Sequence, residues 1–328
     1  MTESTAVASA SAAWPPGVQR RQRVAVVGGG AIGTIVAHAA HRAGHKVTLC
    51  VRSPLAEVTV EREGAQERLS LPAVTRPDRL TAPVDWLFLA TKTYDTQQAL
   101  GWIRALTGPA TRVVALQNGV DHQERIGPLL VVGELLPALV YISAERVSRT
   151  HVVHRWGRRL VVPDTAAGSA LAALFAAGGS GGVDVVTAQD FTTAAWRKFL
   201  TNVAANPLTA LTLRRIGALQ EPRLRELARG LLREAVTVGV AEGASLSGDD
   251  VEQTLDLYAA MHPHSGTSML HDRLARRRLE HDLITGSVVR AAERHGLAVP
   301  LNQAMLALLQ TVEAQNAVEA LERRPAVA

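Results

Sequence analysis

The stretch RVAVVGGGAIGTIVA, residues 23–37, decides the fold class. An apolar, β-branched run ends at Gly28 and apolar residues at helical spacing follow, which predicts a strand, a tight loop and a helix. The loop has the pattern G-x-G-x-x-G. Its first glycine permits the turn, its second lets the backbone approach a pyrophosphate, and its third lets the helix pack on the strand. Because free N–H groups at a helix start favour a diphosphate, we expect a dinucleotide here rather than a turn without a ligand. The expected contacts are Gly28, Gly29, Gly30, Ala31, Ile32 and Gly33.

Strand-like and helix-like segments continue to alternate after this unit. The alternation predicts a doubly wound parallel sheet, which is the architecture of a Rossmann domain. The expected strands lie at 46–51, 84–91, 112–119, 131–142, 151–162 and 183–188, with a helical stretch near 95–106.

The pattern changes to long helices from about Gln189 onward, which predicts a C-terminal all-α domain. We place the boundary near residue 188, giving a Rossmann domain at 23–188 and a helical substrate and catalytic domain at 189–328. The expected helices span 190–205, 222–243, 249–261, 268–296 and 300–322. Residues 1–22 are rich in Ala, Ser and Pro, so we expect a flexible tail there, and frayed residues after about 322.

The composition is that of a soluble globular protein, and the cytoplasm is its simplest location. Hydrophobic residues make up 47% of the 328 and charged residues 20%. No apolar run reaches the roughly 18 residues that a membrane helix needs, and the first 22 residues lack the apolar segment of a secretory signal. Cys50 is the single cysteine, which excludes an intramolecular disulfide and a multi-cysteine metal site. We expect no metal and no membrane partner.

The net charge of +5 and the pI near 9.9 raise the question of nucleic-acid binding. The arginines are scattered, however, and aromatic residues make up only 4% of the chain. An anionic small ligand explains a mild positive bias equally well, so we expect no nucleic-acid partner. The sequence leaves open whether the protein is a homodimer.

Arg52 bears on the choice of cofactor. In a Rossmann unit an acidic residue about 20 positions after the glycines accepts the ribose hydroxyls of NAD. Here Arg52 stands 19 residues after Gly33, and no Asp or Glu lies between them. A guanidinium pairs well with a 2′-phosphate, so the sequence favours NADPH, the alternative being an ordinary surface arginine.

Lys92 and Asn118 each follow an expected buried strand. Ligands of open α/β sheets bind beyond the carboxyl ends of the strands, so both side chains are expected in the crevice for the nicotinamide half of the cofactor. The alternatives are a solvated lysine at a helix start and a plain Asn-Gly turn.

Lys198, Asn202 and Asn206 are spaced by four residues in WRKFLTNVAANPLTA, residues 196–210. Helical spacing of four puts them on one face, in a largely apolar segment where polar groups need partners, unless that face is simply solvated. Pro207 is expected to kink or end the helix near Asn206. The chain has only three lysines, at 46, 92 and 198. An ammonium releases its proton when partly desolvated, so Lys198 is a candidate general acid for reduction of a ketone.

A second polar cluster lies in HSGTSMLHDRLARRRLEHDLITG, residues 264–286. Ser268 and Glu280 are 12 residues apart and share a helix face if the helix is unbroken. Glu280 follows Arg276 at helical spacing, so an intrahelical ion pair is the alternative to a role at the site.

Together these residues resemble the ketopantoate reductases (2-dehydropantoate 2-reductases) from about residue 23 to 310. The similarity rests on VVGGGAIG, VRSP, ATKTYDT, QNGVD, WRKFLTNVAANPLTALT, SMLHDRLARRRLEHDLITGSVV and HGLAVPLNQ. It implies a Rossmann domain followed by a helical domain like that of 6-phosphogluconate dehydrogenases, with the active site in the cleft.

The resemblance also implies roles for particular residues. Lys198 matches the proton donor of the family, and Ser268 matches a position that faces the substrate carboxylate. The implied substrate contacts are Asn118, Lys198, Asn202, Asn206 and Ser268. The implied cofactor contacts outside the glycine loop are Arg52, Lys92, Asn118, Ala144 and Glu280.

The chain departs from the family pattern in places. Ile216 stands where relatives often have Asn, Thr267 where Ser is common, and His271 where Gln is common; Thr150 stands near a usual Gly. The expected activity is NADPH-dependent reduction of ketopantoate to pantoate, in pantothenate biosynthesis. Two alternatives remain at this point: reduction of another 2-oxo acid or an imine, which Ile216 supports, and a non-catalytic NADPH sensor, against which the presence of Lys198 speaks.

Overall fold

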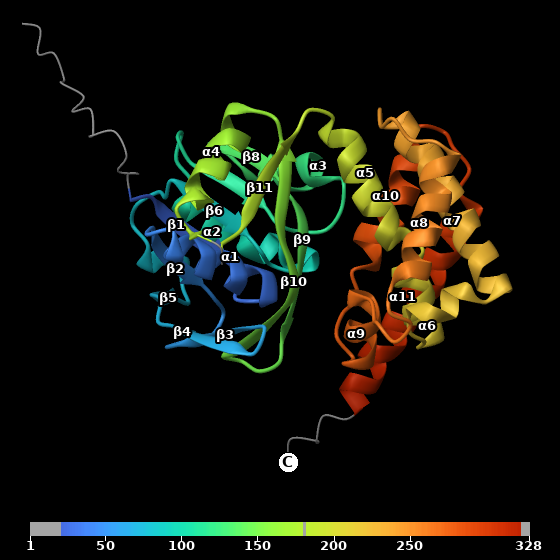
Figure 1. Cartoon of the computed structure of the whole chain (residues 1–328), viewed down its shortest axis with the longest axis horizontal. Coiled ribbons are helices and arrows are strands. Elements are labelled where there is room, and N and C mark those ends of the chain that lie inside the picture. Colours follow the sequence, from blue (N-terminus) through green and yellow to red (C-terminus); the bar gives the residue numbers. More distant parts are fainter. Residues whose placement is uncertain (1–20, 180–181, 323–328) are drawn as a thin grey trace, which may run out of the picture.

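The structure, a computed structural model, describes residues 21–179 and 182–322. It has two parts (Figure 1): strands and flanking helices form the first, and helices alone form the second. The flexible tail expected at 1–22 falls almost wholly outside the described residues, and so do the frayed residues expected after 322. No described helix is long and apolar enough to cross a membrane.

The first sheet is parallel throughout, in the order β5-β2-β1-β6-β7-β8. Its strands are β1 (Arg23–Val27), β2 (Lys46–Cys50), β5 (Ala73–Val74), β6 (Trp86–Leu89), β7 (Arg112–Ala115) and β8 (Glu134–Pro137). The helices α1 (Ala31–Arg42), α2 (Leu100–Leu106) and α3 (His122–Ile126) connect or flank them. The predicted Rossmann sheet is confirmed. The chain builds the sheet from β1 toward β5, then returns to β6 on the other side of β1 and continues to β8.

Burial on both faces explains why these strands are continuous apolar runs. In β1, Val24 and Val26 belong to the core cluster that includes α1, whereas Ala25 and Val27 belong to the cluster that includes α2. Successive residues of a strand point to opposite faces, so a strand covered on both sides shows no polar alternation. The sequence signal was therefore strong here.

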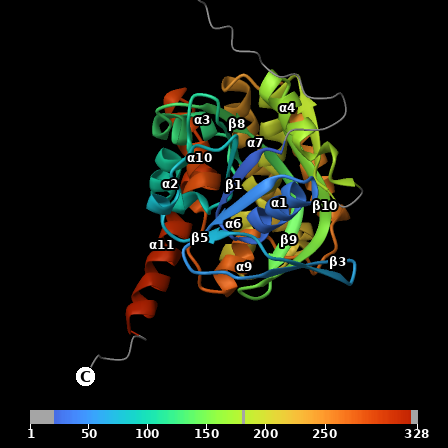
Figure 2. The same ribbon diagram turned by 90° about the vertical axis from the view of Figure 1, so that its left-hand side faces the viewer.

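A second, mixed sheet in the order β11-β10-β3-β4 was not anticipated. It contains β3 (Val58–Arg62), β4 (Ala65–Leu69), β10 (His151–Pro163) and β11 (Asp184–Ala188), and β9 (Leu139–Arg146) pairs antiparallel with β10. Strands were predicted near 131–142, 151–162 and 183–188, and the structure places most of them in this sheet. Helix α1 packs against both sheets (Figure 2), and α4 (Ala166–Ala176) packs against β11.

The hairpin of β3 and β4 escaped prediction because both strands are short and β4 is polar. The residues of β4 are Ala-Gln-Glu-Arg-Leu, and all but the last are exposed. Without alternation of apolar and polar side chains, nothing local distinguishes such an edge strand from a loop.

The second part consists of helices around one apolar core, as expected. These are α5 (Phe191–Val203), α6 (Ala205–Thr212), α7 (Pro222–Ala241), α8 (Gly248–Ala260), α9 (Ser268–Leu274), α10 (His281–Arg294) and α11 (Pro300–Glu322). The helices predicted at 222–243, 249–261 and 300–322 are confirmed within two residues at each end.

The helix predicted at 190–205 is divided in two. It stops at Val203, Ala204 is a turn residue, and α6 follows from Ala205. Pro207 lacks the N–H that would bond the carbonyl of Val203, and its ring crowds that carbonyl. The predicted effect of Pro207 is present, but the interruption lies before Asn206, which therefore belongs to the first turn of a new helix.

The prediction of one helix over 268–296 was wrong. Helix α9 ends at Leu274 and α10 begins at His281. Arg276 has a left-handed φ of 53°, and the N–H of Arg277 bonds the carbonyl of Asp272 at 2.8 Å, which closes the end of α9. Ser268 and Glu280 therefore do not share a helix face, and Glu280 is the residue before α10.

Candidate active site

The glycine loop has the close packing that its pattern requires. Gly28 has a φ of 109°, and a side chain there would lie 2.7 Å from the carbonyl oxygen of Ala90. A Cβ on Gly33 would lie 2.0 Å from the carbonyl oxygen of Gly28, so helix and strand touch at this point. Gly30, by contrast, has no atom within 4 Å of the Cβ position. No side chain caps the start of α1, so no side chain competes with an anion for the first N–H groups of the helix.

Arg52 follows β2 and has an accessible guanidinium. Its side chain is 84% exposed, and Nη1 lies 3.8 Å from Oδ2 of Asp95, a loose contact. Nearby, Nη2 of Arg149 donates to the carbonyl of Pro54 at 2.9 Å, which ties the β9–β10 hairpin to the same loop. The edge of the dinucleotide domain is thus cationic where a 2′-phosphate would lie.

Lys198 and Asn202 of α5 meet the loop after β7 at a pocket between the two parts of the chain. Its lining consists of Gln117, Asn118, Gly119, Ala138, Leu139, Val140, Ala195, Lys198, Phe199 and Asn202. The structure thus brings together three of the residues that the sequence singled out, from segments about 80 residues apart. Its polar side chains are Gln117, Asn118, Lys198 and Asn202, and the rest of the lining apart from Gly119 is apolar.

The ammonium of Lys198 lacks an anionic partner. Among the described residues no carboxylate lies within ion-pair distance, and the Nζ atom is 5.7 Å from the centroid of the Tyr141 ring. Burial lowers the pKa of Lys198 from its ordinary value, because desolvation disfavours the charged form. A lysine of this kind can give up its proton more readily than a solvated one.

Asn206 lies at a different corner from Asn202, contrary to the single face that spacing of four predicted. Its side chain is 2% exposed, and its Oδ1 accepts from the hydroxyl of Ser268 at 3.4 Å and from the N–H of Met269 at 3.3 Å. Because α6 is separate from α5, Asn206 joins the start of α9. The exposed Ser268 is thereby held beside it.

Lys92 and Glu280 contact each other directly, together with Asp272. The Nζ atom of Lys92 is 2.8 Å from Oδ2 of Asp272 and 3.0 Å from Oε2 of Glu280. Thr93 donates its N–H and its hydroxyl to Oε1 of Glu280, at 3.3 and 2.8 Å. Burial alone would lower the pKa of Lys92, but the charges and hydrogen bonds of Glu280 and Asp272 raise it. The sequence left open an ion pair of Glu280 with Arg276 on one helix. Because α9 ends at Leu274 and α10 begins at His281, the two residues do not lie on one helix.

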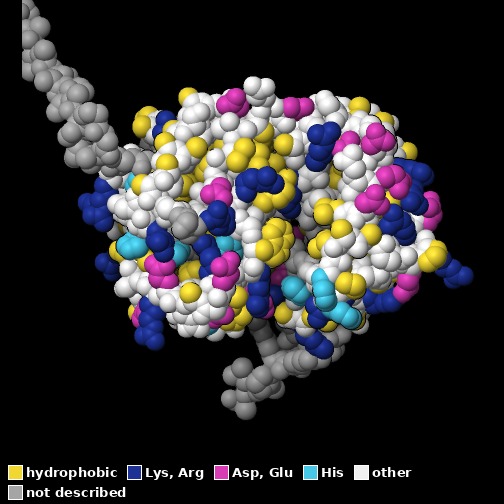
Figure 3. All heavy atoms as spheres, in the orientation of Figure 1, with side chains coloured by type: hydrophobic (Ala, Val, Ile, Leu, Met, Phe, Trp, Pro, Cys, Tyr) yellow, Lys and Arg dark blue, Asp and Glu magenta, His cyan; other side chains and the backbone are white. Residues whose placement is uncertain are grey.

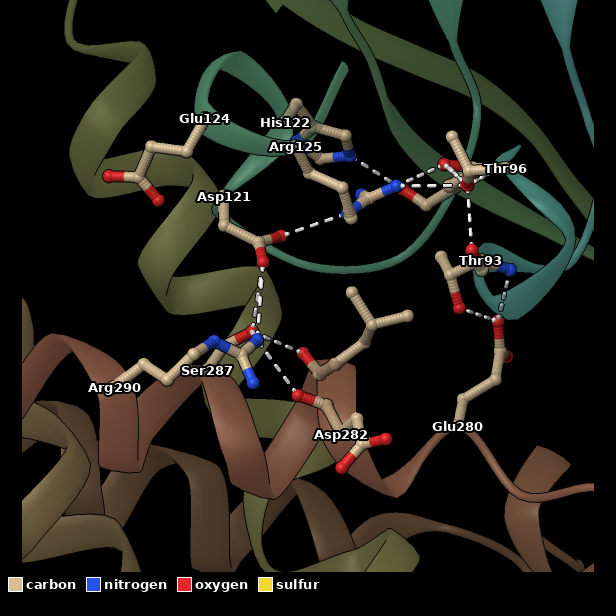
Figure 4. Close-up of polar contacts among 12 residues, drawn as sticks. Thr93, Thr96, Asp121, His122, Glu124, Arg125, Glu280, Asp282, Ser287 and Arg290 are labelled. Atoms are coloured by element: carbon tan, nitrogen blue, oxygen red, sulfur yellow. Dashed lines mark hydrogen bonds and ion pairs between the residues drawn. The ribbon is translucent and has the colours of Figure 1, made fainter. Parts of the chain in front are cut away.

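A second set of polar contacts joins the two parts beside Glu280 (Figure 4). Asp121, just after the Asn118 loop, accepts from Nε of Arg125 at 3.4 Å and from the Ser287 hydroxyl of α10 at 3.3 Å. Nη2 of Arg290 is 3.5 Å from the same carboxylate. The loops after β6 and β7 are therefore both fastened to α10 or to the segment before it.

Tyr141, Gln117 and Asp272 belong to the site but were not singled out from the sequence. The side-chain amide of Gln117 donates to the carbonyl and the hydroxyl of Thr91, linking the loops after β6 and β7. Asp272 lies four residues after Ser268 on α9, a spacing that was a usable signal. Tyr141 carried no local signal, because its contact with Lys198 depends on how a strand meets a distant helix.

Ala144 lies on β9, paired with His154 of β10 and partly buried. No group of three or more metal-ligating side chains occurs in the described parts of the chain. On the face drawn in Figure 3, Lys and Arg side chains are dispersed among Asp and Glu.

The arrangement defines a two-domain, dinucleotide-binding oxidoreductase, with a Rossmann domain for the cofactor and a helical domain that supplies one wall of the pocket. Comparison with known proteins narrows the class. Residues 24–167 match the family model for ketopantoate reductase PanE/ApbA, and residues 190–313 match the model for its C-terminal part. This chain belongs to the ketopantoate reductase family.

Individual relatives agree with this assignment over nearly the whole chain. The 2-dehydropantoate 2-reductase of Caulobacter vibrioides is 39% identical over 287 residues, covering 87% of this chain and 97% of the relative. The enzyme of that name from Mycobacterium tuberculosis H37Rv is 38% identical, and the match covers 87% of this chain and 96% of the relative. The structure of a PanE/ApbA family ketopantoate reductase from Ralstonia eutropha superposes with a TM-score of 0.82 at 31% identity, covering 90% and 99%. The structure of a dimeric ketopantoate reductase from Staphylococcus aureus superposes with a TM-score of 0.81 at 25% sequence identity. The match covers 90% of this chain and 99% of that one.

Proposed function

We propose that this protein reduces ketopantoate to pantoate with NADPH, and that Lys198 donates the proton. The observation that carries the proposal is the half-buried ammonium of Lys198, which has no carboxylate partner among the described residues and lies in a pocket with Asn118 and Asn202. Reduction of a ketone leaves negative charge on oxygen, and a positioned acid that protonates it contributes roughly 10²–10⁴-fold to the rate. Lys198 is the group of this pocket with a proton to give.

The residues of the Rossmann domain fit NADPH, which when bound supplies a hydride. The open space at Gly30 and the uncapped start of α1 would hold the diphosphate, and Arg52 would pair with the 2′-phosphate. Lys92, Ala144 and Glu280 are proposed to contact the cofactor as well. The Lys92–Glu280 pair would then fix the cofactor crevice by joining the two parts of the chain.

The substrate is proposed to lie between the amides and Ser268. Asn118 and Asn202 line the pocket around Lys198, and Asn206 holds Ser268 at the neighbouring corner. Hydrogen-bond donors on two sides of a 2-oxo acid orient the ketone toward Lys198, and such orientation supplies a large part of the rate.

Ile216 supports one alternative, a related reductase of another 2-oxo acid or an imine. Its side chain is 1% exposed in the core of the helical domain, and its N–H bonds the carbonyl of Ser265 at 3.0 Å. The position therefore offers the substrate no amide, unlike the Asn common among relatives. Loss of a polar contact changes discrimination between acids that differ by one hydroxyl.

Steady-state rates with a panel of 2-oxo acids, each with NADPH and with NADH, test the proposal. We expect the highest kcat/KM for ketopantoate with NADPH. If kcat/KM for ketopantoate were orders of magnitude below that for another acid, that acid would be the substrate instead. If NADPH were not consumed with any of the acids, the proposal that the protein is a reductase would be wrong.

Three broader features are part of the same proposal. The domain boundary is placed near residue 188, between the end of β11 at Ala188 and the start of α5 at Phe191. A homodimer is proposed because the Staphylococcus aureus relative is described as dimeric. Cytoplasmic location is proposed from the composition.

A further inference from the structure

Two cations lie on one aromatic ring beside the pocket. The Nζ atom of Lys198 is 5.7 Å from the ring centroid of Tyr141, and the guanidinium carbon of Arg159 is 4.7 Å from the same centroid. Both distances are within the roughly 6 Å at which a ring face attracts a cation. Among the described residues neither Lys198 nor Arg159 forms an ion pair with a carboxylate.

We propose that Tyr141 and Arg159 are positioning residues for Lys198. The ring of Tyr141 holds the ammonium in the pocket in place of a carboxylate, and the guanidinium of Arg159 on the same ring opposes the charged form. This inference rests on the proposed role of Lys198 as proton donor and adds what controls its proton.

Lys92, which is only partly buried, shows why the partner matters. Lys92 contacts two carboxylates, and its pKa is raised; Lys198 contacts a ring, and burial lowers its pKa. A carboxylate within hydrogen-bond distance stabilises an ammonium far more than a π face does. A ring therefore fixes the position of Lys198 without making its proton too difficult to release.

The strand pairing builds this arrangement into the fold. Tyr141 and Arg159 are direct partners in the antiparallel ladder of β9 and β10, after an irregularity between Trp156 and Arg159. Side chains directly opposite each other on a sheet lie close enough to interact. The ladder therefore sets Arg159 on the ring, and the packing of α5 brings Lys198 to it.

The carboxylates on elements around Lys198 are engaged elsewhere. Asp250 of α8 pairs with Arg197 at 2.7 Å, and Asp121, after β7, contacts Arg125 and Arg290. Glu280 is bound by Lys92 and Thr93. The remaining pocket lining from the loop after β7 and from β8 to β9 is neutral. The ring of Tyr141 is thus the contact that remains for the ammonium of Lys198, and Arg159 is the second cation on that ring.

The scarcity of lysine permits a direct test. Reductive methylation with ¹³C-formaldehyde labels the three lysine side chains and the N-terminus of the full-length protein, and Lys198→Ala assigns one NMR signal. Titration of that signal gives the pKa of Lys198 without any turnover. The variants are Tyr141→Phe, which keeps the ring, Tyr141→Met, which fills the space without a π face, and Arg159→Gln. Arg155→Gln on the same strand, whose guanidinium pairs with Glu145, is the matched control.

Tyr141→Met should lower the pKa of Lys198 by about one unit, since a desolvated ring contact changes proton affinity roughly tenfold. Tyr141→Phe should match the wild type. Arg159→Gln should raise the pKa by a smaller amount, roughly a few tenths of a unit, because it removes a positive charge that is exposed and screened. Arg155→Gln should leave it unchanged.

An unchanged or higher pKa in Tyr141→Met would overturn the role of the ring, and so would a Tyr141→Phe variant that behaves like Tyr141→Met. If Tyr141→Met does not fold, Arg159→Gln decides: an unchanged or lower pKa overturns the proposal. The limb of kcat at high pH should move with the NMR value in each variant. Normal turnover by Lys198→Ala would show that Lys198 is not the proton donor. The NMR titrations would still decide whether Tyr141 and Arg159 control its pKa.

Discussion

The ammonium of Lys92 lies 3.0 Å from Oε2 of Glu280, although the two residues are 188 positions apart and belong to different parts of the chain. Asp272 completes the contact from α9. One cation thus holds two buried carboxylates from the helical domain against the loop after β6. This contact fixes the relation between the cofactor crevice and the helical domain.

Lys92→Met should therefore destabilise the protein. It leaves the carboxylate of Glu280 without its cation, while Asp272 keeps only its pair with Arg277. Breaking a buried pair from one side costs about 3–5 kcal/mol. Since the Lys92 side chain is 40% exposed, we expect a smaller loss, on the order of 2 kcal/mol. Urea unfolding measures it, with the exposed Lys46→Met as control. Equal stability of the two variants would show that the contact is not a structural tie.

Lys198→Ala should lower kcat by at least about a hundredfold with the fold intact, because the proton donor is removed. Lys198→Arg should be no better, since a guanidinium does not release its proton. Circular dichroism checks the fold and NADPH consumption gives the rate. Near-normal turnover of either variant would contradict the assignment.

The pH dependence of kcat should show a loss of activity on the alkaline side. The active form of Lys198 is protonated, so the rate falls as pH rises through its pKa. Burial lowers that pKa, which places the fall below about 10.4, the ordinary value for lysine. A rate that stays constant up to pH 10.5 would mean that Lys198 does not lose its proton in this range or does not supply it.

Arg52→Ala should reduce the preference for NADPH over NADH. The guanidinium is proposed to pair with the 2′-phosphate, and charge-assisted contacts of this kind contribute about 1.5–3 kcal/mol. We expect kcat/KM for NADPH to fall at least about tenfold, and kcat/KM for NADH to stay within twofold or so. An equal fall with both cofactors would show that Arg52 acts on the fold rather than on the phosphate.

Two glycines of the loop should respond differently to alanine. At Gly33 a methyl group would lie 2.0 Å from a backbone oxygen, so Gly33→Ala should displace α1 from β1 and lower the melting temperature markedly. At Gly30 there is open space and an ordinary φ of −72°, so Gly30→Ala should fold normally and bind NADPH weakly. Calorimetric titration with NADPH measures the second effect. Unaltered binding by Gly30→Ala would move the diphosphate away from this position.

Prediction from sequence succeeded where the signal was local. The strand, loop and helix of residues 23–42 follow from an apolar run and three glycines, because both faces of the strand are buried and the loop geometry admits no side chain at Gly28 and Gly33. It failed at the short hairpin of β3 and β4, whose outer strand β4 is a polar edge strand. It also failed at the break between α9 and α10, where a left-handed Arg276 interrupts an otherwise helical pattern.

The candidate site divides in the same way. Sequence spacing and resemblance to a family were enough to select Lys198, Asn118 and Asn202, which the structure places around one pocket. They did not show that Asn206 turns toward Ser268, because the division of the helix ahead of Pro207 changes the direction of the chain. Nor did they show that Glu280 meets Lys92 rather than a neighbour on its own helix.

The sequence by itself determined the Rossmann unit, the helical second half, the family and the main polar residues of the site, since each depends on residues close together in the chain or on a recurring motif. Only the tertiary structure decided the partners of those residues. Lys92 and Lys198 are the same residue type, each in a motif of the family, but packing brings two carboxylates to the first and the ring of Tyr141 to the second. That difference in neighbours, set by contacts between distant segments, is what separates a structural cation from a candidate acid.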